Sequence, residues 1–116
     1  MIGLDTGFFI EVLKSNEEAV NVLRQIHDGE DACISGLTLF ELRRLALNGL
    51  LEMEFVDVVI QDIQSFCTVC WLDNVEIHDF AAGLSRDLGI SAMNSLLLAG
   101  LVLSGAETIY TTDSRM

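Results

Sequence analysis

Four short apolar runs alternate along this chain with longer segments whose apolar residues recur at helical spacing. We interpret the apolar runs as β-strands at residues 1–5, 32–35, 68–72 and 108–112. Strands that alternate with helices are typical of a parallel sheet whose faces are covered by those helices. The alternation therefore predicts an α/β fold with a central parallel sheet of about four strands.

The segments between the predicted strands carry signals for helix starts and helix ends. Ser15 or Asn16 is placed to cap the second helix, and Gly29 and Gly89 are placed to end helices. We find no repeat, low-complexity tract or linker, so we expect one domain over residues 1–116. The predicted helices cover residues 7–14, 16–28, 37–47, 50–66, 75–88 and 91–104.

The composition and the net charge limit the classes of protein to which this chain can belong. Apolar residues make up 51% of the 116 residues, which is enough for a sizeable core and argues against disorder. The formal net charge of −12 argues against nonspecific nucleic-acid binding through a broad basic face, although it does not exclude a small nuclease. The acidity itself fits a soluble surface, a basic partner, or carboxylates gathered for a metal ion.

Features of the sequence also bear on the cellular location of the protein and on the oxidation state of its cysteines. The start resembles no signal peptide, and the apolar stretch at residues 96–103 is too short to span a bilayer, so we expect a cytoplasmic protein without membrane contact. Three cysteines fit reduced thiols better than a disulfide framework. Cys67 and Cys70 have zinc or redox spacing, but residues three apart in a strand point to opposite faces.

Acidic and amide side chains follow or precede the predicted strands. Asp5 ends the first apolar run and Asp113 ends the last, while Glu41 lies in the third helix and Asn94 in the first turn of the last helix. The carboxyl ends of parallel strands meet at one edge of a sheet, so we expect these four side chains to lie in one cleft. Converging oxygens are what a hard divalent cation needs, which predicts a metal site.

Four motifs in this order make the chain resemble the PIN domain, a metal-dependent ribonuclease fold that includes the VapC-type toxins of toxin–antitoxin pairs. They are LDT at residues 4–6, SGLTLFEL at 35–42, GISAMNSLLLA at 89–99 and IYTTD at 109–113. The resemblance covers nearly the whole chain and implies a three-layer α/β/α fold. Relatives commonly continue to a further edge strand, so we expect a domain without that strand or a piece of a longer chain.

The resemblance also implies a site and a reaction. Asp5, Glu41, Asn94 and Asp113 would bind one or two Mg²⁺ or Mn²⁺ ions, which activate water for attack on an RNA phosphodiester. In the family an aspartate usually stands at position 94, so the asparagine removes one carboxylate, although an amide oxygen also coordinates hard cations.

The same resemblance implies roles for residues close to the four expected metal ligands. Thr6 and Thr111 would orient the carboxylates or water. Arg43 and Arg44, close beyond Glu41, are candidates for holding a phosphate of RNA, or else solvent-exposed charges of a helix.

Three classes of function remain open from the sequence. The first is a PIN-type endoribonuclease that acts as a toxin, is regulated by an antitoxin protein and forms a homodimer. The second is a catalytically weakened PIN scaffold that binds RNA or protein, which Asn94 favours. The third is another α/β domain with acidic residues at the edge of its sheet, such as a receiver or a dehalogenase-like phosphatase. Against this class, the chain lacks the late lysine of a receiver and the second aspartate of such a phosphatase.

The apolar side chains of the first predicted helix have two alternative roles. They would form a dimer or antitoxin interface, or they would be part of the monomer core. These residues are Phe8, Phe9, Ile10 and Leu13.

Overall fold

The computed structural model describes residues 1–112, and within them it has a four-stranded parallel sheet. The strand order is β3-β2-β1-β4, so the first and last strands of the chain are neighbours, with Leu4 paired to Tyr110. Asp5, directly after β1, therefore lies beside the end of β4. The strands are Ile2–Leu4 (β1), Ala32–Ser35 (β2), Thr68–Cys70 (β3) and Thr108–Tyr110 (β4).

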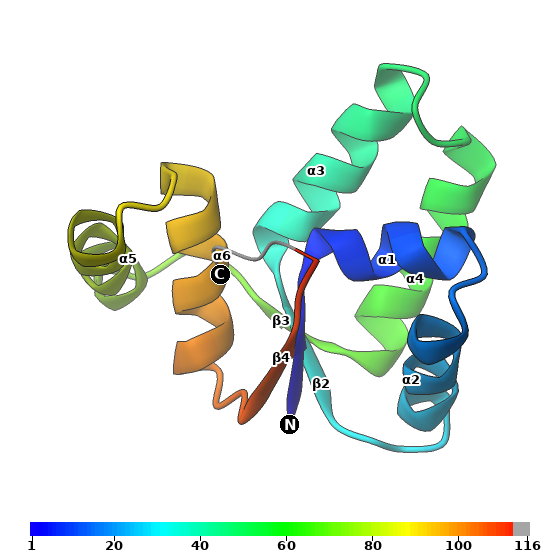
Figure 1. The fold of residues 1–116 in the computed structure, drawn as a ribbon, viewed down its shortest axis with the longest axis horizontal. Coiled ribbons are helices and arrows are strands. Elements are labelled where there is room, and N and C mark those ends of the chain that lie inside the picture. Colours follow the sequence, from blue (N-terminus) through cyan, green and yellow to red (C-terminus); the bar gives the residue numbers. More distant parts are fainter. Residues whose placement is uncertain (113–116) are drawn as a thin grey trace.

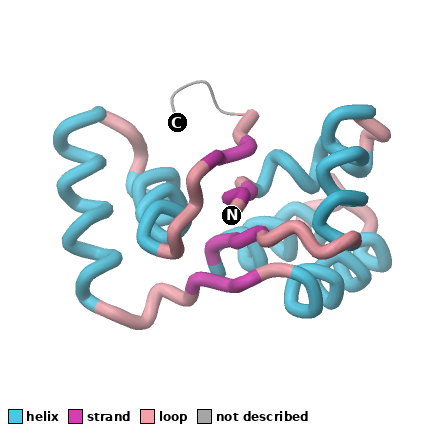
Figure 2. Tube along the Cα trace, turned by 90° about the horizontal axis from the view of Figure 1, so that it is seen from below, coloured by secondary structure: helices cyan, strands magenta, loops and turns pink. Residues whose placement is uncertain are grey.

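Helices cover both faces of this sheet in three layers, as predicted (Figure 1). Helices α1 to α4 lie on one side, and α6 lies on the other with α5 packed against it (Figures 1 and 2). Their bounds are Thr6–Leu13 (α1), Glu17–His27 (α2), Gly36–Leu47 (α3), Met53–Phe66 (α4), Val75–Leu88 (α5) and Ala92–Leu103 (α6). None of them is both long and apolar enough to cross a membrane.

The helix ends follow the expected capping chemistry. Asn16, one of the two predicted candidates, caps α2 by accepting a hydrogen bond from the backbone of Ala19 at 3.0 Å. Gly89 ends α5 in the left-handed conformation, with φ of +66°. Helix α4 begins at Met53, three residues later than predicted, because the chain at residues 48–52 forms the connection from α3.

The last strand is shorter than predicted, and the difference matters for the site. It ends at Tyr110, whereas the apolar run continues to residue 112. The hydroxyl of Thr111 and the backbone N–H of Thr112 both donate to Asp5. These donors lie beyond the β4 segment that pairs with β1, at the carboxyl edge of the sheet.

The core resolves an alternative that the sequence left open. Phe8 and Phe9 are buried, and the Phe8 ring makes edge contacts with Phe9 and with Tyr110 at centroid distances of 5.1 and 5.0 Å. These rings therefore belong to the monomer core rather than to an interface with another protein, and they tie α1 to β4. Of this group only Leu13 is exposed.

The two cysteines with metal-binding spacing do not converge. Cys67 packs in the cluster under α1 to α4, whereas Cys70 packs against Ile77 and Ala99 on the α5–α6 side. Burial, with smaller contributions from Cys33 and Asp62, raises the pKa of Cys67 to about 11. Its thiol is therefore protonated at neutral pH, which makes it a poor ligand or nucleophile.

Candidate functional site

Asp5 lies at the junction of β1 and α1 and is 5% exposed. One carboxylate oxygen accepts the backbone N–H of Phe8 at 2.9 Å, which caps α1. The other oxygen accepts the hydroxyl of Thr111 at 2.7 Å and the backbone N–H of Thr112 at 3.0 Å. Asp5 thus joins the start of α1 to the chain after β4, and a buried carboxylate in this position is held in one orientation.

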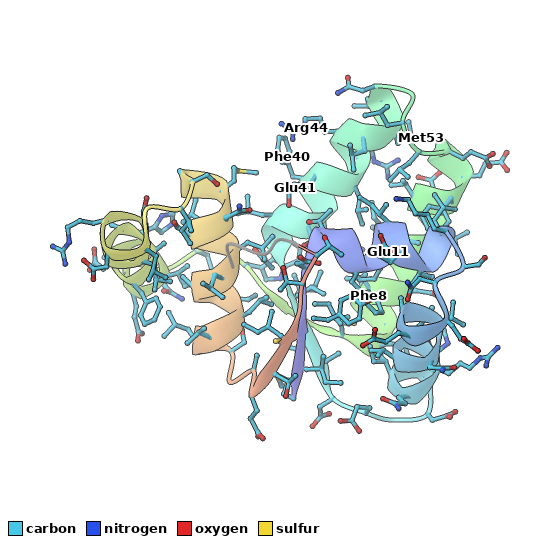
Figure 3. The ribbon with its side chains drawn as sticks, viewed as in Figure 1. Phe8, Glu11, Phe40, Glu41, Arg44 and Met53 are labelled. Atoms are coloured by element: carbon cyan, nitrogen blue, oxygen red, sulfur yellow. The ribbon has the colours of Figure 1, made fainter. Side chains whose placement is uncertain are left out.

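Glu41 reaches the same region from α3, on the side of that helix that faces α6 (Figure 3). One of its carboxylate oxygens accepts the Thr6 hydroxyl at 2.6 Å. The Thr6 oxygen lies 3.1 Å from the hydroxyl oxygen of Thr38, which is fully buried. Because the single hydrogen of Thr6 is donated to Glu41, Thr38 must donate to Thr6.

The relay from Thr38 through Thr6 to Glu41 includes a residue that the sequence analysis missed. Thr38 lies one helical turn before Glu41, so both side chains are on neighbouring positions of one face of α3. That spacing was the available signal, but a threonine at this spacing is also an ordinary buried residue. Only the tertiary contact with Thr6 shows which role it has.

Asn94 completes the group from the first turn of α6, and its backbone N–H donates to the Ser91 side chain at 3.2 Å. The side chains of Asp5, Glu41 and Asn94 line one cavity of about 270 Å³ at the carboxyl edge of the sheet. Three of the four predicted ligands are therefore brought together, as expected. The fourth, Asp113, lies outside the described residues.

A glycine at the start of α1 allows the close approach on which the cavity depends. A Cβ atom built on Gly7 would overlap the side chain of Thr112. The chain after β4 can therefore pass against α1 and donate to Asp5 only because position 7 has no side chain. The rest of the lining consists of Thr6, Ile10, Arg44, Leu45 and Leu97.

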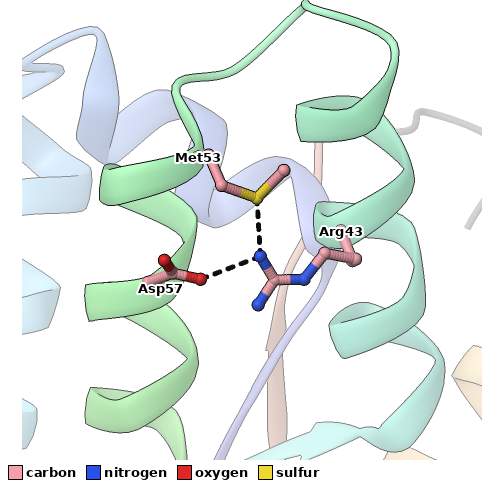
Figure 4. A network of polar contacts seen from close by, with 3 residues as sticks. All are labelled: Arg43, Met53 and Asp57. Atoms are coloured by element: carbon pink, nitrogen blue, oxygen red, sulfur yellow. Dashed lines mark hydrogen bonds and ion pairs between the residues drawn. The ribbon is translucent and has the colours of Figure 1, made fainter.

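The two candidate arginines occupy different environments. Nη1 of Arg43 donates to Asp57 at 2.8 Å and to the sulfur of Met53 at 2.7 Å, which ties α3 to α4 (Figure 4). Arg44 instead lines the cavity, with its guanidinium carbon 5.6 Å from the centre of the Phe40 ring. Within residues 1–112, Arg44 is the arginine positioned to meet a ligand in the cavity.

The donor set fits a hard divalent cation. A carboxylate offers about four acceptor positions, and three of those on Asp5 are occupied by hydrogen bonds, which leaves one for a metal ion. The second oxygen of Glu41 accepts no hydrogen bond from any residue in the described part of the chain. In residues 1–112 no three histidine, cysteine or acidic side chains converge, so the described set comprises two carboxylates and the Asn94 amide.

Replacing Thr38 with valine should weaken divalent-cation binding about tenfold, in the range found when partners of metal ligands are removed. Valine keeps the shape but removes the hydroxyl that orients Thr6 toward Glu41. Titration calorimetry with Mn²⁺ would measure the affinity, and Thr38→Ser, which keeps the hydroxyl, should restore it. Equal affinities for the parent, Thr38→Val and Thr38→Ser would show that the relay does not position Glu41.

Comparisons with known proteins identify the family and the fold. A family model described as the PIN domain matches residues 2–116. A toxin–antitoxin complex from Klebsiella pneumoniae has a TM-score of 0.73 at 16% identity, with 98% of this chain and 88% of that chain covered. VapBC2 from Rickettsia felis, solved bound to a DNA fragment from its promoter, has a TM-score of 0.74 at 17% identity over 97% and 89% of the two chains. No curated protein matches the chain. At these identities the structural likeness shows a shared fold.

Proposed function

Because the chain belongs to the PIN domain family, whose model matches residues 2–116, we propose that it is a metal-dependent endoribonuclease that hydrolyses RNA phosphodiester bonds. One observation carries the proposal. Asp5, Glu41 and Asn94 come from three separate elements, β1–α1, α3 and α6, and line a single cavity. Such convergence of oxygen ligands at the carboxyl edge of a parallel sheet is typical of a catalytic site rather than of a solvated surface.

Asp5, Glu41 and Asn94 would hold Mg²⁺ or Mn²⁺, with Asp113 as a further ligand. When bound, the ion would activate water and offset the negative charge that develops on the phosphodiester. Thr6 keeps the Glu41 carboxylate oriented, and Thr111 does the same for Asp5. The Arg44 guanidinium, at the wall of the cavity, would hold a phosphate of the RNA.

We assign the protein to the toxin side of a toxin–antitoxin pair that acts on RNA in the cytoplasm. This assignment is supported by the two structural neighbours, which are toxin–antitoxin complexes, and by the match to the PIN domain. Leu47 and Leu50, at 72% and 70% exposure, lie at the end of α3 and just beyond it and would contact an antitoxin or a second copy in a homodimer.

A second candidate function is a weakened PIN scaffold that binds RNA or protein without cleaving it. It is favoured by Asn94, because an amide supplies an oxygen ligand but no negative charge for the cation. Cleavage by the purified protein separates the two candidates.

The purified protein should cleave a pool of single-stranded RNA when Mn²⁺ is added and should not cleave it in EDTA. Glu41→Gln should remove the activity, because glutamine keeps an acceptor for Thr6 but removes the charge that binds the ion. Gel analysis of end-labelled RNA measures the rate. Absence of Mn²⁺-dependent cleavage, together with retained RNA binding, would support the scaffold instead, and cleavage that persists in Glu41→Gln would point to a contaminating nuclease.

A further inference from the structure

A large aromatic side chain is exposed beside the cavity. Phe40 precedes Glu41 on α3 and is 53% exposed, although a phenylalanine usually contributes to stability by burial. Phe40, Glu41 and Arg44 all lie along the side of α3 that faces α6 (Figure 3). The ring is therefore presented to solvent next to the proposed ligands, where it contributes little to the core.

Arg44 links the exposed Phe40 ring to the cavity. It lies four residues after Phe40 and three after Glu41, so it is adjacent to both on the helix surface. Its guanidinium group lies over the Phe40 ring, and the same residue lines the cavity. A ligand that extends out of the cavity past Arg44 would meet an aromatic ring carrying a planar cation.

The charge of the protein limits how RNA can be held there. The net charge is −12, and Lys14, Arg43 and Arg86 each lie within ion-pair distance of a carboxylate. Few phosphate contacts are available, so counterion release contributes little to affinity for RNA. Stacking of bases on aromatic rings does not depend on the net charge of the protein. An exposed ring beside the cavity would therefore supply affinity that the charges do not.

The exposed Phe40 ring can stack on an unpaired base of RNA but not on a base inside a duplex. Both faces of a base inside a duplex are covered by neighbouring base pairs, whereas an unpaired base offers a free face. We propose that Phe40 is a stacking platform for an unpaired nucleobase of single-stranded RNA, next to the phosphate that Arg44 holds. This inference rests on the proposed ribonuclease function and adds a residue, Phe40, that would bind an unpaired base of that RNA.

Fluorescence anisotropy with a labelled single-stranded RNA tests the platform. Ca²⁺ replaces Mn²⁺, because it takes the same oxygen ligands, and a gel verifies that the RNA stays intact. Phe40→Leu should weaken binding about tenfold, the effect of losing one stacked base, and Phe40→Trp should preserve it. Phe66→Leu is the matched control, since Phe66 is 47% exposed on α4 outside the cavity lining, and its affinity should equal that of the parent.

A series of RNAs with one abasic position each locates the stacked base. One position should weaken binding to the parent about tenfold and leave binding to Phe40→Leu unchanged, because both changes remove the same contact. Duplex RNA should bind the parent and Phe40→Leu equally. The salt dependence of binding should be shallow and should become shallower in Arg44→Met by about one phosphate contact.

Equal affinity of Phe40→Leu and Phe66→Leu for single-stranded RNA would overturn the platform while leaving the ribonuclease proposal intact, provided that the parent still cleaves RNA. A changed oligomeric state of Phe40→Leu in sedimentation, with unchanged RNA affinity, would show that the ring contacts protein and would also overturn it. A parent that neither binds nor cleaves RNA would overturn both proposals together.

Discussion

Asp5→Asn should abolish Mn²⁺-dependent RNA cleavage and lower the melting temperature of the metal-free protein. Loss of cleavage should exceed about 100-fold, because removal of residues that only support a metal ligand already costs 10- to 100-fold. The loss of stability has a separate cause. Both carboxylate oxygens of Asp5 accept a backbone N–H, one from Phe8 and one from Thr112.

An asparagine at position 5 can accept on one side only. In either orientation its NH₂ group faces a backbone N–H, and that donor loses its acceptor. A buried donor left without an acceptor costs about 1–3 kcal/mol, which lowers the melting temperature by about 5 °C or more in a domain of this size. Differential scanning calorimetry and the gel assay measure the two effects.

The matched control is Asp79→Asn, which makes the same change of charge at an exposed position of α5. It should leave both the cleavage rate and the melting temperature unchanged. Retained cleavage in Asp5→Asn would remove this residue from the proposed metal site. A melting temperature equal to that of the control would show that its hydrogen bonds to the segment after β4 contribute little to stability.

Asn94→Asp should tighten Mn²⁺ binding at least about tenfold and raise the rate of RNA cleavage. Two unit charges about 4 Å apart interact by roughly 4 kcal/mol at an effective dielectric constant of 20, and a tenfold change in affinity needs about 1.4 kcal/mol. The attraction to the cation therefore exceeds what is required even after partial screening. In the metal-free protein the same charge lies in one cavity with Asp5 and Glu41, so that state should be slightly less stable.

Calorimetric titration with Mn²⁺ and thermal unfolding across Mn²⁺ concentrations would measure this prediction, because binding to the native state raises the melting temperature. Asn21→Asp, on the exposed surface of α2, adds the same charge away from the cavity and should change neither affinity nor activity. If Asn94→Asp binds Mn²⁺ no better than the parent and cleaves no RNA, position 94 is not a ligand and the scaffold function becomes the better proposal.

The sequence was sufficient to predict the convergence of Asp5, Glu41 and Asn94. Parallel strands joined by helices bring their carboxyl ends to one edge, so residues at strand ends and in the adjoining helices meet there whatever their separation along the chain. The prediction for Asp113 rests on the same argument and lies outside the described residues. Helix ends were predicted within a few residues because capping is local chemistry, as Asn16 and Gly89 show.

The sequence alone determined the α/β class, the parallel sheet and the edge at which the acidic and amide side chains gather, because periodicity and strand ends are written along the chain. Only the tertiary structure decided which neighbours each side chain meets. It separated Arg43, tied to Asp57, from Arg44 at the cavity, and it showed Thr38 behind Thr6. Adjacent residues on a helix point in directions 100° apart, so their partners depend on how that helix packs, which no local pattern records.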